Sequence, residues 1–360
     1  MTDAYNQAVF LQNVLHNLPE ASGCETKTKA VLMDFLSGFQ DLQIVDKGKW
    51  FYAVHKEGAC VPSIAFRAEM DAMVDEHGQT YHGCGHDGHC AIVAALAAWT
   101  SKKTLGKNVY FLFQHAEETG EGAKECSGLF AQESIDSLYG FHNNPGYPAG
   151  TVLLLPHTVT CASRGLVLQF QGKQAHAANP DGGNNPIFPM SAFFSKWNEL
   201  TDPAAFDGMV LATPIYMNAG SHAFGVAAGS GEIGLTLRSW YNSDLEKLEQ
   251  ALLAWAETLA QQSGVLLTHK TQDVFYATVN DPKLFRRCET AIQKANLASM
   301  TLSQPFRSSD DFGRYCSHVR TCYVGIGSGE NAQPLHTPNY QWNNAVTDTA
   351  LKLFQTIILN

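Results

Sequence analysis

Residues that bind metals or move protons gather first in the segment 82–89, which reads His-Gly-Cys-Gly-His-Asp-Gly-His. Its glycines let the backbone bend so that the side chains of Cys84 and His86 can face one point. Thiolate sulfur and imidazole nitrogen are both good ligands for zinc-like cations. The same residues also suit a turn with a buried thiol and surface imidazoles, so the segment alone leaves both interpretations open.

Two adjacent carboxylates, Glu117 and Glu118, follow the apolar run Val109–Phe113, which is expected to form a buried strand. The carboxyl ends of strands are where open α/β sheets place their ligands. Because neighbouring residues on the turn after a strand point in different directions, one carboxylate is able to bind a metal while the other remains a general base or acid. The alternative is a solvated acidic loop.

Single histidines follow two further predicted strands. His142 comes directly after 139–141, and His336 comes soon after 322–325. Either histidine alone is most simply an ordinary hydrogen-bonded residue. Together with the two segments above, however, all of these side chains fall just beyond strands, so we expect them at one edge of one sheet. Five metal ligands and one spare carboxylate at that edge predict a hydrolytic site with paired metals.

The elements that must position these residues alternate between helix and strand in the first part of the chain and again after residue 280. Such alternation predicts a mainly parallel sheet that is covered on both faces, and one sheet shared by both parts. Asp87 is expected to cap the third helix. The helices are expected at 1–20, 27–39, 89–99, 281–295 and the C-terminus, and the strands at 64–68, 109–113, 139–141, 151–155 and 322–325.

The middle of the chain has a different order of elements: strand, helix, strand, strand, helix, strand. This order predicts a split βαβ, ferredoxin-like unit. We therefore expect a metal-binding catalytic domain at 1–161 plus 275–360, interrupted by an inserted domain at 162–274. The inserted elements are expected at 164–171, 186–200, 209–217, 232–240, 244–262 and 265–270.

Composition limits the possible partners. The formal net charge of -10 repels phosphate backbones, so nucleic acid is not expected as a partner. The sequence has neither a signal-peptide pattern nor the roughly 18–20 consecutive apolar residues of a membrane span. The 9 cysteines, an odd number without regular spacing, indicate reduced thiols. We expect a cytoplasmic protein that does not bind membranes.

The motifs described above, taken in their order along the chain, resemble those of the M20 metallopeptidase family. The resemblance is to its amidohydrolase branch of aminoacylases and hippurate hydrolases in particular. Residues Cys84–His89 match the Cys-Gly-His-Asp-Gly-His signature of that branch throughout. The resemblance implies an α/β fold, with a phosphorylase/hydrolase-like zinc-exopeptidase catalytic domain and an inserted ferredoxin-like βαββαβ domain that serves as a lid or dimerisation domain. Further matches are Arg67–Val74, His115–Glu118, His142 with Pro145, Gly172–Pro180, Ser309–Phe312 and Leu335–Pro338.

The resemblance also implies a role for each matched residue. Glu117 would be the general base, and Asp71 would orient a metal ligand. His176 and Arg238, in the inserted domain, would contact the substrate, His176 from its own or from a partner subunit. Two divalent ions would be bound, and Zn²⁺, Mn²⁺, Co²⁺ and Ni²⁺ all suit the ligand types. The implied metal ligands are Cys84, His86, Glu118, His142 and His336.

The sequence departs from the family pattern at a few positions. Glu69 stands for an Asp, Val74 for a Pro, and Gly225 for a substrate-contacting Asn, while an unfamiliar Asn143–Asn144 separates His142 from its proline. The metal set stays intact, so the departures concern the acyl group and the amino acid that the enzyme accepts. We expect metal-dependent hydrolysis of the amide bond of a small N-acyl amino acid or related amide.

Three alternatives remain at this point. A dipeptidase or aminopeptidase of the same family would use the same water chemistry on a dipeptide-like substrate. A thiol hydrolase would use Cys84 as nucleophile with His86 or His89 as base, which leaves the carboxylates unexplained. A non-catalytic metal-binding protein would not need Glu117.

The resembled family includes monomers, dimers and larger assemblies, so a homodimer or higher homo-oligomer remains open.

Overall fold

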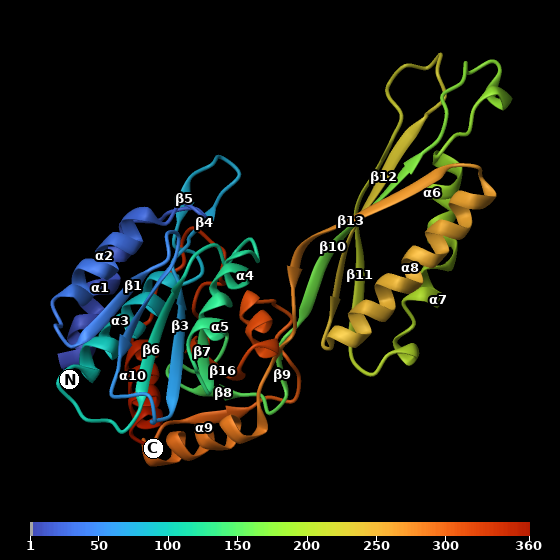
Figure 1. Ribbon diagram of the computed structural model, residues 1–360. Coiled ribbons are helices and arrows are strands. Elements are labelled where there is room, and N and C mark those ends of the chain that lie inside the picture. The colour runs from blue at the N-terminus through green and yellow to red at the C-terminus, as the bar shows by residue number, and fades with distance from the viewer. Residues whose placement is uncertain (1–2) are drawn as a thin grey trace. The chain divides into compact units, whose positions relative to one another are not determined.

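The computed structural model describes residues 3–360, and these divide into two compact units (Figure 1). The first unit contains the chain up to Val159, Thr278–Phe306 and Asp310–Asn360, and the second contains Thr160–Ala277 and Arg307–Ser309. Met1 and Thr2 of the predicted N-terminal helix lie outside the described residues. The role of the second unit as a lid or dimerisation domain stays a prediction.

The first unit is built on an eight-stranded sheet with the order β1-β2-β6-β3-β7-β16-β8-β15. The central strands β6, β3, β7 and β16 run parallel, as predicted, whereas β1 with β2, β2 with β6 and β8 with β16 pair antiparallel. The strands are β1 Leu42–Asp46, β2 Phe51–His55, β3 Ser63–Glu69, β6 Asn108–Gln114, β7 Ser137–Pro145, β8 Val152–Leu154, β15 Ser299–Thr301 and β16 Arg320–Gly329. Two small pairs are β4 Met73–Val74 with β5 Thr80–Tyr81, and β9 Thr158–Thr160 with β14 Thr278–Val279.

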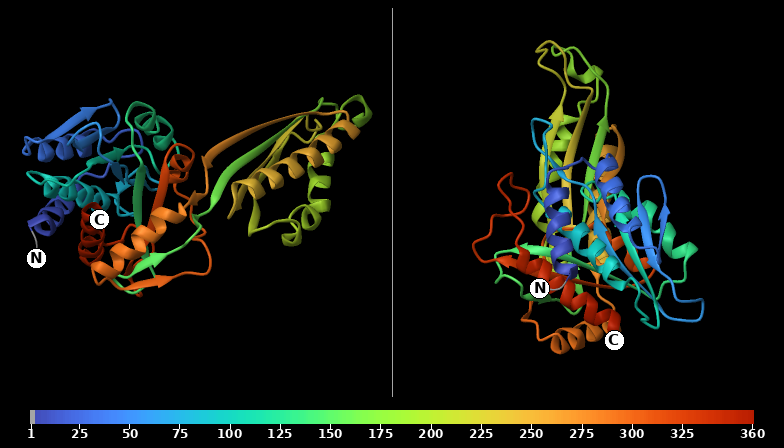
Figure 2. Two further views of the ribbon diagram at one scale, coloured as in Figure 1. Left: turned by 60° about the horizontal axis from the view of Figure 1, so that its bottom comes forward. Right: turned by 90° about the vertical axis from the view of Figure 1, so that its left-hand side faces the viewer.

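Helices cover both faces of this sheet, which explains why β3 and β6 are buried along their whole length. Alternate residues of a strand point to opposite faces, so Phe111 packs in the core of one face and Tyr110 in the core of the other. Helices α1 Asp3–His16, α2 Thr26–Ser37, α3 His86–Thr100, α9 Pro282–Lys294 and α10 Asn344–Leu359 cover the first face. Helices α4 Gly122–Cys126 and α5 Gly128–Gln132 and the 3₁₀ helix Asp311–Ser317 cover the second. The N- and C-terminal helices, α1 and α10, lie on the same face (Figure 2).

The start of α3 differs from the prediction. Gly85 precedes the helix with a φ of 96°, a left-handed conformation that glycine adopts without strain, and no side chain caps the first turn. Asp87 lies inside the first turn, where its carboxylate accepts hydrogen bonds from Gln12 and His16 of α1. The prediction that Asp87 caps α3 is therefore wrong, because the carboxylate joins two helices instead.

The second unit has the predicted ferredoxin-like topology, with four antiparallel strands in the order β11-β12-β10-β13. Helices α6 and α8 pack on one face of the sheet. The predicted helix at 186–200 is split by a 3₁₀ turn, where the rings of Phe193, Phe194 and Trp197 pack together. The elements are β10 Ala162–Gln171, α6 Ile187–Phe193, α7 Trp197–Leu200, β11 Val210–Ala219, β12 Ser230–Ser239, α8 Asn242–Gln262 and β13 Leu266–Phe275. Among residues 3–360, no helix combines the length and apolar character of a membrane span.

Candidate metal centre

The candidate site lies at the edge where the parallel strands of the first unit end. Asp71 follows β3, and Glu117 and Glu118 follow β6. His142 is part of β7, and His86 is the first residue of α3. Because parallel strands end at the same edge, these residues converge although they are distant in sequence.

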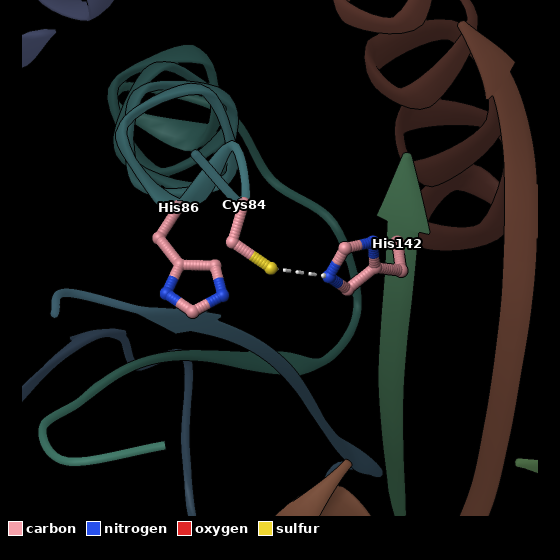
Figure 3. A group of neighbouring side chains, drawn as sticks. All are labelled: Cys84, His86 and His142. Carbon is pink, nitrogen blue, oxygen red and sulfur yellow. Dashed lines mark hydrogen bonds between the residues drawn. The ribbon is translucent and has the colours of Figure 1, made fainter. Parts of the chain in front are cut away.

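Cys84 is central to this group. Its sulfur lies 3.4 Å from Nε2 of His142 and 3.4 Å from Nε2 of His336, and Figure 3 shows the thiol pointing toward the His142 ring. Cys84, His86 and His142 have ligand atoms within 4.8 Å of one another, as do Cys84, Glu118 and His336. The structure thus brings all five predicted ligands together in two overlapping groups that share the cysteine.

Two buried atoms in these groups have no hydrogen-bond partner, namely Nε2 of His86 and Oε1 of Glu118, which lie 3.8 Å apart. Unpaired buried polar atoms are costly and rare. A cation between them would satisfy both atoms at once. The donor set of thiol, imidazole and carboxylate therefore fits a divalent metal ion of the zinc or manganese type.

The orientation of the buried His86 and of the partly buried His142 supports this fit. Nδ1 of His142 lies 2.8 Å from the carbonyl oxygen of Asn143, and Nδ1 of His86 lies 2.9 Å from that of Asp71. Because a carbonyl oxygen only accepts, each Nδ1 carries the proton and each Nε2 is free to bind metal. Burial, and the nearby His89, lower the pKa of His142 to about 3, which keeps its ring neutral.

The surroundings of His86 favour positive charge. Burial lowers the pKa of His86, but the hydrogen bond to Asp71 and the charges of Glu69 and Asp71 outweigh it and raise the pKa to about 10. A metal ion supplies the same positive charge in place of the proton. The carboxylate of Asp71 also accepts hydrogen bonds from Ser22 Oγ at 2.7 Å and from the backbone N–H of Glu118 at 2.9 Å. Asp71 therefore contacts one predicted ligand and the backbone of another.

Glu117 lies beside the ligands without belonging to either group that contains Cys84. Its side chain is buried, at 6% exposure, and Oε1 accepts a hydrogen bond from the backbone N–H of Asp311 at 3.3 Å. Burial, followed by the carboxylates of Asp310 and Glu118, raises the pKa of Glu117 well above its ordinary value. A carboxylate with a raised pKa suits proton transfer near neutral pH.

The two predicted substrate residues belong to the second unit. His176 lies in the loop after β10, where its neighbour Ala177 donates its N–H to the carbonyl of Gly225 at 2.9 Å. Arg238, on β12, donates from Nη1 to the carbonyl of Arg307 at 2.5 Å and to Ser309 Oγ at 2.8 Å. Their roles in binding substrate stay predictions.

Sequence reasoning missed a buried charge cluster next to the site. Arg67, 2% exposed, forms ion pairs with Glu69, Asp310 and Asp311, and its Nε donates to Gln114 at 2.9 Å. Burial raises the pKa of Asp311 to about 7, with Arg67 opposing the shift. The sequence carried a signal, since an arginine inside the apolar run Ile64–Ala68 needs buried partners.

A second group that the sequence did not reveal surrounds His89. Its Nδ1 lies 3.0 Å from the carboxylate of Glu69, and its Nε2 lies 2.6 Å from Oδ1 of Asn143. Asn143 in turn donates to the hydroxyl of Tyr340, in the loop that follows His336, at 2.6 Å. Two positions that depart from the resembled pattern, Glu69 and Asn143, thus meet on one imidazole.

Comparison with known proteins agrees with this geometry. The sequence pattern of Peptidase family M20/M25/M40 matches residues 65–360. This chain belongs to that family. An uncharacterized hydrolase of Staphylococcus epidermidis is 26% identical over 96% of both chains, and an N-acetyldiaminopimelate deacetylase of Listeria monocytogenes is 27% identical over 89% of this chain and 91% of the relative.

Solved structures share the fold of this M20 family member. A putative aminohydrolase from methicillin-resistant Staphylococcus aureus superimposes with a TM-score of 0.89 at 22% identity, covering 99% of this chain and 96% of its own. YXEP of Bacillus subtilis, a dinuclear metal-binding peptidase of the M20 family, gives 0.83 at 20% identity, with 99% and 98% covered. The predicted family and fold are confirmed, and the protein is a hydrolase that acts on amide bonds.

Proposed function

We propose that this protein hydrolyses the amide bond of small N-acyl amino acids or related amides, with two divalent metal ions and with Glu117 as general base. The observation that carries the proposal is the pair of ligand groups that share Cys84, with a separate buried carboxylate, Glu117, beside them. The relative from Listeria, by its name a deacetylase of an N-acetylated amino acid, supports the substrate class.

The residues that would hold the two ions are Cys84, His86, Glu118, His142 and His336. Bound there, divalent cations would lower the pKa of a water molecule and polarise the carbonyl group of the substrate. Asp71 fixes the ring of His86 through the hydrogen bond from Nδ1 to its carbonyl oxygen and through its carboxylate, whose Oδ1 lies 3.3 Å from Nδ1, so that Nε2 stays directed into the site.

Glu117 moves the proton in this proposal. Its carboxylate accepts a proton from the attacking water and then returns it to the nitrogen of the leaving amine. The N–H of Asp311 orients Oε1 of Glu117, while Oε2 lies 3.9 Å from Nε2 of His86, on the side of the ligands. In this proposal Glu118 would bind metal, and Glu117 would remain free for the proton.

His176 and Arg238 are proposed to contact the substrate. The imidazole of His176 would hydrogen-bond the carbonyl oxygen of the substrate as it gains negative charge. Arg238 would pair with a substrate carboxylate. Nη1 of Arg238 is engaged by Arg307 and Ser309, so a carboxylate would be bound through its other guanidinium nitrogens.

The test measures hydrolysis of N-acetyl amino acids, N-benzoyl amino acids and dipeptides by wild type, Glu117→Gln and Glu121→Gln. Glu121 is an exposed glutamate four residues away and serves as the matched control. Each protein is stripped of metal and given back Mn²⁺, Zn²⁺, Co²⁺ or Ni²⁺. We expect metal to restore cleavage in wild type and in Glu121→Gln, and Glu117→Gln to bind metal without cleaving.

The other outcomes separate the alternatives. Cleavage that survives metal removal would favour a thiol nucleophile, although burial, followed by Glu118 and Glu117, raises the pKa of Cys84, the opposite of what such a nucleophile requires. Full activity of Glu117→Gln would exclude that residue as the base. Cleavage of dipeptides but not of acyl amino acids would assign the protein to the peptidases of the family.

A further inference from the structure

We propose that Glu25 is a positioning residue, which holds the backbone of Ala116 in a left-handed conformation and thereby directs Glu117 and Glu118 into the site. The inference rests on the proposed function for the roles of these two glutamates. It adds a residue that is 91 positions away in the sequence and that no motif singles out.

The backbone just before the two glutamates is strained. Ala116 has a φ of 48°, a left-handed conformation that side chains with a Cβ rarely adopt and that glycine adopts freely. Ala116 is the second residue after β6, so its conformation sets the direction in which Glu117 and Glu118 leave the strand. Strain of this kind persists only where the surrounding structure enforces it.

Contacts hold Ala116 on both sides. Its N–H donates to Oε1 of Glu25 at 2.7 Å, and its carbonyl accepts from the N–H groups of Gly122 at 3.0 Å and Glu121 at 3.2 Å. The carbonyl contacts are local and close the turn. The contact on the N–H side is made by a side chain from another element, and it is the one that a substitution can remove.

The carboxylate of Glu25 is committed to this contact. Glu25 occupies the N-cap position of α2, yet its side chain does not cap that helix. Glu20 caps α2 instead, because its carboxylate accepts from the N–H groups of Lys27 and Thr28. The side chain of Glu25 is 4% exposed, and its Oε1 accepts only backbone N–H groups, those of Gly23 at 2.8 Å and of Ala116.

The same segment supports the other side of the glutamate pair. Ser22 donates to Oδ2 of Asp71, and Oδ2 of Asp71 accepts the N–H of Glu118. The segment Glu20–Glu25 therefore fixes the backbone before Glu117 through Glu25 and the backbone of Glu118 through Ser22 and Asp71. Removing one of these contacts misdirects the glutamates without touching the ligands themselves.

The test compares Glu25→Met, which keeps the volume but has no acceptor oxygen, with Glu25→Gln, which retains one. We expect Glu25→Met to lower kcat and to weaken metal binding by about 10- to 100-fold, and KM to change by less than about threefold. Glu25→Gln is expected to restore most of both. Metal affinity is measured by competition with a chelator, so this readout does not depend on activity.

Ala116→Gly provides a rescue in the Glu25→Met background. Because glycine adopts a positive φ without strain, the double variant no longer needs the hold on the N–H and should regain at least about tenfold in kcat over Glu25→Met. A glutamate that served only the stability of the fold predicts a different pair of results: kcat per folded Glu25→Met already equals that of wild type, and Ala116→Gly raises only the free energy of unfolding, because it relieves the strain at this positive φ. A double variant no better than Glu25→Met overturns the proposal.

Hydrogen exchange provides a test that needs no variant. If Glu25→Met does not fold, hydrogen exchange of the Ala116 amide in the wild-type protein decides. Strong protection is expected, and exchange at the rate of an unstructured peptide overturns the proposal. Failure of the proposed function can be told apart from failure of the role of Glu25. Full activity of Glu117→Gln would contradict the proposed function. Wild-type kcat and metal affinity in Glu25→Met would contradict only the role of Glu25.

Discussion

The two sheets of this protein differ in how deeply their charged side chains are buried. In the first unit, the central strands are covered on both faces, and Arg67 is buried among Glu69, Asp310 and Asp311 at the edge next to the candidate site. In the second unit, only one face is covered, and strands β11 and β13 are largely exposed. The ion pair of Arg164 with Glu249 in this unit leaves 12% of each side chain exposed.

The two units therefore differ in whether their sheets bury charged side chains. Burying charges costs stability unless each is paired and hydrogen-bonded, so the buried cluster around Arg67 depends on every one of its partners. The first unit accepts that cost at the ends of its parallel strands. The second unit, whose sheet has a solvated face, has no such cluster among residues 160–277 and 307–309.

The largest effect is expected from Arg67→Met. The substitution leaves three carboxylates buried without their cation, and breaking a buried ion pair from one side typically costs about 3–5 kcal/mol. Arg164→Met in the second unit is the matched control, with an expected loss of about 1 kcal/mol because water reaches its partner. Urea denaturation of both variants measures the free energies of unfolding. Equal losses would remove the contrast between the units.

Metal removal should affect the first unit alone. We expect bound metal, at 100 times its dissociation constant, to stabilise that unit by about 2.7 kcal/mol, because the ions bind only the folded state. Hydrogen exchange with and without chelator localises the change. Amides around Cys84–His86 and at the end of β6 should exchange faster without metal, while those of β10 and β12 keep their rates. Uniform loosening of both units would contradict this expectation.

A smaller effect is expected where a charge of the first unit is only half buried. His16 of α1 pairs with buried Asp87 of α3 at 2.7 Å, and this hydrogen bond raises the pKa of His16. A raised pKa in the folded state means stabilisation that is complete below about pH 6.5 and is lost as the pH rises through the folded value.

His16→Ala should therefore cost about 0.5–1 kcal/mol at pH 6, and less at pH 9. Thermal unfolding across this pH range measures the cost, with the exposed His77→Ala as control. A cost that grows toward pH 9 would show that the ion pair is not its source.

The smallest effect is expected on the open face of the second unit. Ile215 of β11 is 58% exposed, so Ile215→Thr should change the free energy of unfolding by less than about 0.5 kcal/mol. Denaturation at several protein concentrations checks this value. A larger loss that depends on protein concentration would indicate that a second copy of the chain covers this face, as in the homo-oligomer that the sequence leaves open.

Local pattern was a good guide wherever burial itself determined the element. Strands β3 and β6 are short apolar runs, and their predicted positions agree with the structure to within two residues. Strands β1 and β2 were missed, because β1, at the edge of the sheet, has mixed residues, and the short run of β2 becomes a strand only through pairing with β1 and β6. The cap assigned to Asp87 failed for a related reason, since the carboxylate found partners on a distant helix.

The sequence by itself determined the family, the two-part order of elements and the side chains that converge at the strand ends, because these follow from local spacing and from the rule that parallel strands end together. Only the tertiary structure decided what surrounds them. Arg67 meets Asp311 across 244 residues, and Glu25 meets Ala116 across 91. Such contacts leave no periodic trace, because a carboxylate that accepts one distant hydrogen bond looks in the sequence like any other acidic residue.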